Sequence, residues 1–440
     1  MESSTKQKTD QAMLHRCEQW SQVETKLGLE LEASARQAKA LLRRREIRSA
    51  SDLLRLVLVY CEQDWSLQQV GLWAVLQGLG YLSDVAILKR LRNCSSWLGH
   101  LLYACVAQRR AQWAEQAGLR VRLRDATVIN EPGSRGVTWR LHLKLDLGAR
   151  CISGVEITDA HGGESFARLP IEPGEIQVGD RGYGFASSIG ALLAQQAHVV
   201  VRINWSSLPL WTAHGVRFGL IDWLCPLSTP SEHTVHIQTK TADYPLRLIA
   251  CPLPPQAIEA ARRRARETAR KNKHTISEAT LLTAGWLLLV TDLPGAQWPI
   301  ERILWLYRLR WQVELQFKAY KSLLHFDGLR AKDPRLIRTY LYGKLLLVLL
   351  LEQLTHQVRL QQPEWFADLD RPVSLWGLTT SLKEQLRQLL TGRVTLTHFW
   401  ACLPALERYV RLSPRARPQQ LAWGQALLEH LSCQFSFFGC

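Results

Sequence analysis

The spacing of hydrophobic residues changes twice along the chain, from a helical period to a strand period and back. Residues 1–118 place apolar side chains three or four positions apart, as over 27–42 and 53–60, and this spacing predicts helices. From Val121 apolar and polar residues alternate or apolar residues form short runs, which predicts strands. The predicted strands are 121–129, 139–147, 151–158, 176–179 and 198–204, with a helix over 186–197. The central part of the chain is therefore predicted to be α/β.

The simple alternation ends after about residue 205. Alternating segments at 216–224, 232–240 and 244–255 predict a strand-rich insertion, and a helix with many arginines and lysines follows it up to Lys273. Residues 285–294 then return to the pattern of a buried strand. Later residues are helical again, over 334–358 and 374–409, with a break at Pro414 and Pro418.

Composition and charge narrow the classes of partner. The 440 residues are 47% hydrophobic, which is enough to form the cores of folded domains. The formal net charge of +16 favours a polyanionic partner, and nucleic acid is the leading candidate. A membrane is excluded as the main partner because the longest purely apolar run, 345–351, is far shorter than the ~20 residues that span a bilayer. The polar N-terminus predicts a cytoplasmic protein. The ten cysteines show no zinc-ligand or disulfide pattern, which predicts reduced, structural thiols.

Residues 66–91 contain a candidate helix-turn-helix. A helical run is followed by Gly78 and Gly80, a candidate N-cap at Ser83, and a second helix with a basic end. Plain packing of two helices explains the pattern about as well as DNA reading by 83–92 does, and the basic end favours DNA slightly.

The segment 307–321 carries an unusual charge pattern. A single helix beginning near Ile300 would place five side chains in one narrow stripe: Tyr307, Arg310, Glu314, Lys318 and Lys321. A solvated face with i,i+4 ion pairs is the alternative. Large aromatic residues beside the stripe, including Trp311, favour a partly buried site instead.

This spacing reproduces the motif Y-x(2)-R-x(3)-E-x(6)-K, and the chain thereby resembles the bacterial insertion-sequence DDE transposases of the IS-four family. The resemblance implies an RNase H-like catalytic core in which Glu314 is the third carboxylate of a metal-binding triad. It also implies that the basic and aromatic members of the motif contact the transposon end.

Two further carboxylates complete the expected triad. Asp125 lies within the first predicted strand and is followed by Ala126 and Thr127, as in the resembling family. Asp180 follows a short strand and begins a D-R-x-Y-like sequence that ends at Tyr183. The alternatives are an aspartate facing water on an edge strand and a plain Asp-Gly turn. A carboxylate at the carboxyl end of a strand is a usual place for ligand chemistry.

The resemblance implies a transposase that binds the ends of its own element, cleaves the DNA, and joins the 3′ ends to target DNA in cut-and-paste transposition. Asp125, Asp180 and Glu314 would hold two Mg²⁺ ions, or Mn²⁺, about 4 Å apart. The expected DNA contacts are Tyr307, Arg310, Trp311, Lys318, Lys321, Trp286, Arg262, Arg263, Arg264 and Arg266. The alternatives are an RNase H-fold nuclease and a non-catalytic DNA-binding protein derived from a transposase.

Trp286 has two alternative roles. The resemblance implies that its indole receives a base flipped out of the DNA end, whereas packing in the core explains a tryptophan at this position equally well.

The expected partners are double-stranded element ends and target DNA, with a homodimer in the synaptic complex. The resulting regions are 1–118, a helical N-terminal DNA-binding region; 119–204, the first part of the RNase H-like core; 205–285, the strand-rich insertion with the basic helix; 286–330, the second part of the core with the signature helix; and 331–440, a helical C-terminal region with a candidate dimer contact.

Overall fold

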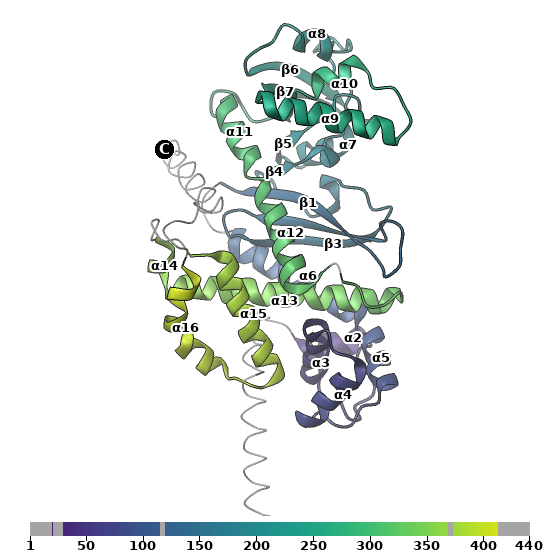
Figure 1. The fold of residues 1–440 in the computed structure, drawn as a ribbon, viewed down its shortest axis with the longest axis vertical. Helices are drawn as coiled ribbons and strands as arrows, with labels where there is room; N and C mark the ends of the chain where they lie inside the picture. The colour runs from purple at the N-terminus through teal and green to yellow at the C-terminus, as the bar shows by residue number, and fades with distance from the viewer. Residues whose placement is uncertain (1–19, 21–29, 115–118, 327, 368–372, 412–440) are drawn as a thin grey trace, which may run out of the picture. The chain divides into compact units, whose positions relative to one another are not determined.

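The computed structural model describes residues 20, 30–114, 119–326, 328–367 and 373–411 (Figure 1). The chain forms two compact units. Unit 1 comprises residues 1–116, 128–139 and 316–427, and unit 2 comprises 117–127, 140–315 and 428–440. Within the described ranges, no helix is both long and apolar enough to cross a membrane.

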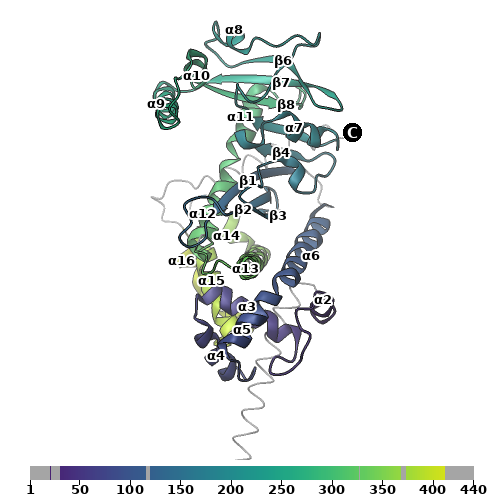
Figure 2. The same ribbon diagram turned by 90° about the vertical axis from the view of Figure 1, so that its right-hand side faces the viewer.

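An eight-stranded sheet runs through unit 2 in the order β3-β2-β1-β4-β5-β8-β7-β6 (Figure 2). The strands are β1 (Val121–Ile129), β2 (Trp139–Asp146), β3 (Cys151–Asp159), β4 (Ile176–Gly179), β5 (His198–Arg202), β6 (Ser231–Gln238), β7 (Asp243–Pro252) and β8 (Trp286–Thr291). Strands β1, β4 and β5 are parallel neighbours, whereas β8 pairs antiparallel with β5 and β7, and β7 with β6. The predicted α/β fold with an RNase H-like core is confirmed.

The strand-rich insertion extends the core sheet. Strand β8 pairs with core strand β5 on one side and with insertion strand β7 on the other, so one hydrogen-bonded ladder connects the two regions. The strand predicted over 216–224 is wrong, because Leu220–Leu224 forms the short helix α8. Leu220 and Leu224, four residues apart, both face the core, and this burial follows the helical period.

The remaining helices of unit 2 surround this sheet or follow it. They are α7 (Ala186–Leu193), α9 (Pro255–Lys271), α10 (Glu278–Thr283), α11 (Ile300–Arg308) and the start of α12 (Trp311–Leu324), which continues into unit 1. The single signature helix predicted from Ile300 is wrong, because the helix breaks at Leu309–Arg310. Around the break the backbone makes tighter bonds, from Arg310 N to Tyr307 O at 3.0 Å and from Gln312 N to Leu309 O at 2.9 Å. The break therefore places Tyr307 and Glu314 on different helices.

Unit 1 is helical, as predicted. Its helices are α2 (Leu31–Gln37), α3 (Ala50–Gln63), α4 (Leu67–Leu76), α5 (Asp84–Asn93), α6 (Ser95–Ala114), α13 (Pro334–Gln361), α14 (Pro363–Ala367), α15 (Leu375–Thr391) and α16 (Leu396–Val410). The helix predicted over 27–42 is shorter, because α2 ends at Gln37 and Lys39 adopts φ 58°. The segment 374–409 is divided at Gly392, which has φ 74° and ends α15. The predicted break at Pro414 and Pro418 lies outside the described residues.

The candidate helix-turn-helix has the predicted local geometry. Gly78 and Gly80 have φ of 72° and 106°, and Ser83 caps α5 by accepting a 3.3 Å hydrogen bond from Ala86 N. At the basic end of α5, however, Arg92 Nε lies 2.7 Å from Asp333 Oδ2. Arg92 thus already has an acidic partner within unit 1, while Lys89 remains exposed.

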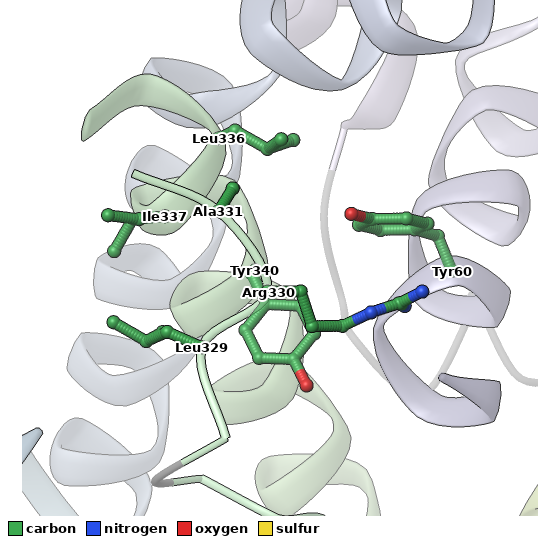
Figure 3. Close-up of a pocket in the computed structure, with 7 residues that line it drawn as sticks. All are labelled: Tyr60, Leu329, Arg330, Ala331, Leu336, Ile337 and Tyr340. Atoms are coloured by element: carbon green, nitrogen blue, oxygen red, sulfur yellow. The ribbon is translucent and has the colours of Figure 1, made fainter. Parts of the chain in front are cut away.

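A small pocket in unit 1 lies between α3, the segment that precedes α13, and α13 itself (Figure 3). It is lined by Tyr60, Leu329, Arg330, Ala331, Leu336, Ile337 and Tyr340. The Arg330 guanidinium lies 5.0 Å from the centre of the Tyr60 ring and donates to Trp65 O at 2.5 Å. The Tyr340 hydroxyl donates to Asp64 Oδ1 at 3.0 Å. Both hydrogen bonds go to residues at or just after the end of α3, so the contacts around the pocket join α3 to α13.

Candidate active site

Strand register brings the first two carboxylates together. In the parallel pair β1/β4, Leu123 lies opposite Val178. Two residues further along the chain are Asp125, in the middle of β1, and Asp180, just after the end of β4, so continuing the same register places these aspartates side by side. Because β1 lies between β2 and β4, the alternative of an aspartate on an edge strand is wrong for Asp125.

The Asp125 carboxylate lies in a partly desolvated, acidic environment. Its pKa is raised to about 7, chiefly by burial; the charges of Asp180 and Glu164 also raise it, while the hydrogen bond from the Ala126 amide and the charge of Arg310 lower it. The Ala126 N–H donates to Asp125 Oδ1 at 2.8 Å and orients the carboxylate. Asp125 thus interacts electrostatically with both neighbouring carboxylates and with the arginine of the signature motif.

Asp180 starts a tight turn that also holds a fourth carboxylate. Its Oδ1 accepts a 2.9 Å hydrogen bond from Gly182 N, which caps the short 3-10 helix η2 (Arg181–Tyr183). A Cβ added at Gly182 would lie 1.6 Å from Glu164 Oε2, so the Glu164 carboxylate packs directly against this glycine. Sequence reasoning missed Glu164, because it lies in a polar loop whose composition is that of an ordinary turn.

Glu314, the third expected carboxylate, is held by the signature arginine. Arg310 Nη2 donates to Glu314 Oε1 at 2.5 Å, and the guanidinium lies 5.9 Å from the centre of the Tyr307 ring. Burial raises the pKa of Tyr307, Arg310 and Arg202 lower it, and Asp180 raises it. Tyr307 and Arg310 therefore connect Glu314 electrostatically to the two aspartates. All of these groups belong to unit 2.

These carboxylates fit a divalent cation in the chemistry of their donors. Asp125 and Asp180 offer hard oxygen ligands on adjacent strands, and their mutual repulsion is the kind that a bound cation relieves. No three His, Cys, Asp or Glu side chains in the described ranges are gathered closely enough to hold a metal ion. Glu314 is instead paired with Arg310, so a complete triad requires its carboxylate to share or leave that guanidinium.

The expected DNA contacts differ in their exposure. On α9, Arg263, Arg264 and Arg266 are exposed, whereas Arg262 is partly buried and donates to Leu281 O at 3.1 Å. The Trp311 indole at the start of α12 is 48% exposed. Lys318 is exposed and Lys321 partly exposed on the part of α12 that belongs to unit 1.

Trp286 lies in the hydrophobic core of unit 2. Its side chain is 7% exposed and belongs to the same buried cluster as Leu288 and Val290 of β8. An indole that stacks on an extruded base needs an open face. This burial supports the packing alternative that the sequence left open.

Replacing Trp286 by alanine is expected to reduce the free energy of unfolding by about 3 to 5 kcal/mol, because a buried indole leaves a cavity. Both strand cleavages should fall together. Trp311→Ala is the matched control: its exposed indole should leave the melting temperature within a few degrees of the wild type. Thermal melts of both variants make the comparison. A Trp286→Ala protein with an unchanged melting temperature and a selective loss of second-strand cleavage would contradict the packing role.

Known transposases resemble this chain over most of its length. The family model described as a transposase DDE domain matches residues 116–351, which include all three carboxylates. InsL for insertion sequence element IS186A of Escherichia coli (strain K12) is 39% identical over 345 residues, covering 76% of this chain and 93% of that protein. The transposase for IS421 of Escherichia coli is 39% identical over 346 residues, with the same coverage. The transposase for IS231F of Bacillus thuringiensis subsp. israelensis is 40% identical over 90 residues, covering 20% of this chain and 19% of that protein.

The matched domain spans more than half of the chain and includes both the parallel strands that carry Asp125 and Asp180 and the segment that carries Glu314. The 39% identity over 76% of the chain extends the likeness well beyond these motifs. The chain therefore belongs to the DDE transposase family of insertion sequences.

Proposed function

We propose that this transposase cleaves the DNA ends of its own element and joins the 3′ ends to target DNA by cut-and-paste transposition. The observation that carries the proposal is the strand register that places Asp125 beside Asp180, with Arg310 linking Glu314 to them. Carboxylates gathered on neighbouring parallel strands, where metal ions can be held between them, suit phosphoryl-transfer chemistry.

Asp125, Asp180 and Glu314 would hold the divalent cations, for which Mg²⁺ fits the all-oxygen donor set and Mn²⁺ would substitute. Bound there, two such ions activate the attacking oxygen and stabilise the leaving oxygen of an in-line displacement. The Ala126 and Gly182 amides orient the two aspartates. Arg310 pairs with Glu314, and a guanidinium at this place would also suit a phosphate of the DNA.

The exposed cations extend the DNA surface beyond the carboxylates. The arginines at 263, 264 and 266 of α9 are exposed, and Glu267 is the one acid among residues 262–267. Trp311 offers an aromatic face for the terminal nucleotides. In unit 1, the α4–α5 pair would contact the element end, with Lys89 as its exposed cation. A homodimer would bring two ends together in the synaptic complex.

A joining assay tests the function directly. The purified protein is incubated with Mg²⁺, linear DNA that carries the element's terminal repeats, and a supercoiled target. We expect cleavage at the repeat ends and covalent end-to-target products whose junctions show a short target duplication. Cleavage that never yields joined products would instead support the nuclease alternative. Specific binding to the ends with no cleavage at all would support the non-catalytic alternative.

A further inference from the structure

Two arginines, Arg181 and Arg202, lie next to Asp180. In the parallel pair β4/β5, Gly179 lies opposite Val201, so the next residues along the strands, Asp180 and Arg202, are neighbours. Arg181 directly follows Asp180 in η2. Asp180, just after β4, thus lies between Asp125 of β1 and Arg202 of β5.

Close backbone contact keeps the two arginines near each other. A Cβ added at Gly184 would lie 2.6 Å from Arg202 O and 3.5 Å from Arg181 O, so only glycine allows η2 to approach the end of β5 this closely. Partial burial lowers the pKa of Arg181, and the charge of Arg202 lowers it further, while Tyr307 and Asp180 raise it. The two guanidinium groups therefore repel each other across a short distance.

The side chains of this arginine pair lack the partners that other arginines of unit 2 have. Within the described ranges, neither Arg181 nor Arg202 has a carboxylate within 4.0 Å, and Arg202 Nε is buried without a hydrogen-bond partner. By contrast, Arg122 contacts Asp146 and Glu175. Arg181 is exposed and Arg202 half-buried, so the pair can be reached from solvent.

Two neighbouring guanidinium groups with free donors form a site for a tetrahedral anion, since their planar N–H groups match phosphate oxygens. We propose that Arg181 and Arg202 together bind one phosphate of the DNA strand that enters the Asp125/Asp180 site. The inference rests on the proposed function, because it requires a DNA strand at these aspartates. The arginine pair holds the strand on the side of Asp180 opposite Asp125, so it is a positioning device for the scissile phosphodiester.

The test combines charge-removing variants with charge-removing DNA. Arg181→Gln, Arg202→Gln and the double variant are assayed for binding to the element end in metal-free buffer, where no cleavage occurs. The DNA carries one neutral methylphosphonate at a time, scanned across the phosphates around the cleavage site. Arg120→Gln is the matched control, because Arg120 lies just before the amino end of β1, away from Asp125 in the middle of that strand.

At one position, the methylphosphonate is expected to lower the affinity of the wild type for the DNA to that of the double variant on unmodified DNA. The same methylphosphonate should not lower the affinity of the double variant any further. The double variant should lower the slope of log K against log salt by about 0.9 in total, the value for a single phosphate. Arg120→Gln should still respond to that methylphosphonate as the wild type does. The melting temperatures of the glutamine variants should equal or exceed that of the wild type, because a like-charge repulsion is removed.

Additive effects of variant and methylphosphonate at every position would overturn the proposal, as would a lowered melting temperature with an unchanged salt slope. In either case wild-type protein that still binds and joins element ends leaves the proposed function standing. If the wild type does not prefer element ends over unrelated DNA, the proposed function and the phosphate site fail together.

Discussion

Replacing Asp125, Asp180 or Glu314 by alanine is expected to reduce Mg²⁺-dependent cleavage of element ends by about 10³-fold or more. Metal ions at such sites contribute several kcal/mol to the transition state, and each 1.36 kcal/mol corresponds to a tenfold change in rate. Binding to the ends should persist, because removing a carboxylate also removes a negative charge near the DNA phosphates. Single-turnover cleavage and end binding are measured for each purified variant.

Glu301→Ala serves as the control for this series, since Glu301 is an exposed carboxylate on α11, in the same unit as the triad. It should cleave at the wild-type rate. A folded variant of any triad residue that cleaves at a rate near that of the wild type would show that this residue is not a metal ligand. Equal loss of cleavage and of end binding would point to a disrupted fold, which thermal melts of the same samples would reveal.

The triad could be predicted from the sequence because each carboxylate belongs to a short motif with fixed spacing. It did not show how the motifs meet, since strand register arises from hydrogen bonds between segments about 50 residues apart along the chain. The break at Leu309–Arg310 was missed for a related reason. The charge stripe fits a continuous helix, and a tighter turn in its middle leaves the sequence period nearly unchanged.

The burial of charged side chains was the other feature that the hydrophobic pattern did not predict. In β2, the polar residues His142, Lys144 and Asp146 alternate with leucines, as in a strand with one solvent-exposed face. All three polar side chains are nevertheless buried. Lys144 lies under the loop that runs from β3 to β4, whose Pro170 carbonyl accepts a 2.8 Å hydrogen bond from Lys144 Nζ, and Asp146 is paired with Arg122. A period-2 pattern marks which residues share a face, but it does not show what covers that face.

The centre of this buried network is Glu175, just before β4. Its side chain is fully buried and accepts from Arg122 Nε at 2.9 Å and from Lys144 Nζ at 3.2 Å. Gln177 Nε2 donates to it at 3.0 Å, and Arg124 Nη1 donates to Gln177 Oε1 at 3.2 Å. Arg124 precedes Asp125, so the network ties both strands of the aspartate pair to one buried carboxylate.

Glu175→Gln is expected to lower the free energy of unfolding by about 3 to 5 kcal/mol, because it leaves the Lys144 charge buried without its carboxylate. For a unit of about 200 residues this corresponds to a fall in melting temperature of roughly 6 to 20 °C. Glu156→Gln is the matched control: Glu156 lies 3.4 Å from Arg168 in a pair that is partly exposed, and such pairs contribute only about 0 to 1 kcal/mol.

The pH dependence of stability provides a second measurement on the same pair of variants. Burial raises the pKa of Glu175, but Lys144 and Arg122 lower it more, and the net pKa is below the ordinary value. Its contribution is therefore present above the unfolded pKa of about 4.3 and is lost as the pH falls through the lower folded pKa. Melting temperatures of the wild type and of Glu175→Gln should converge below about pH 4, while Glu156→Gln follows the wild type throughout. A gap between wild type and Glu175→Gln that stays constant down to pH 2 would show that the lost stability comes from packing and not from the buried charge.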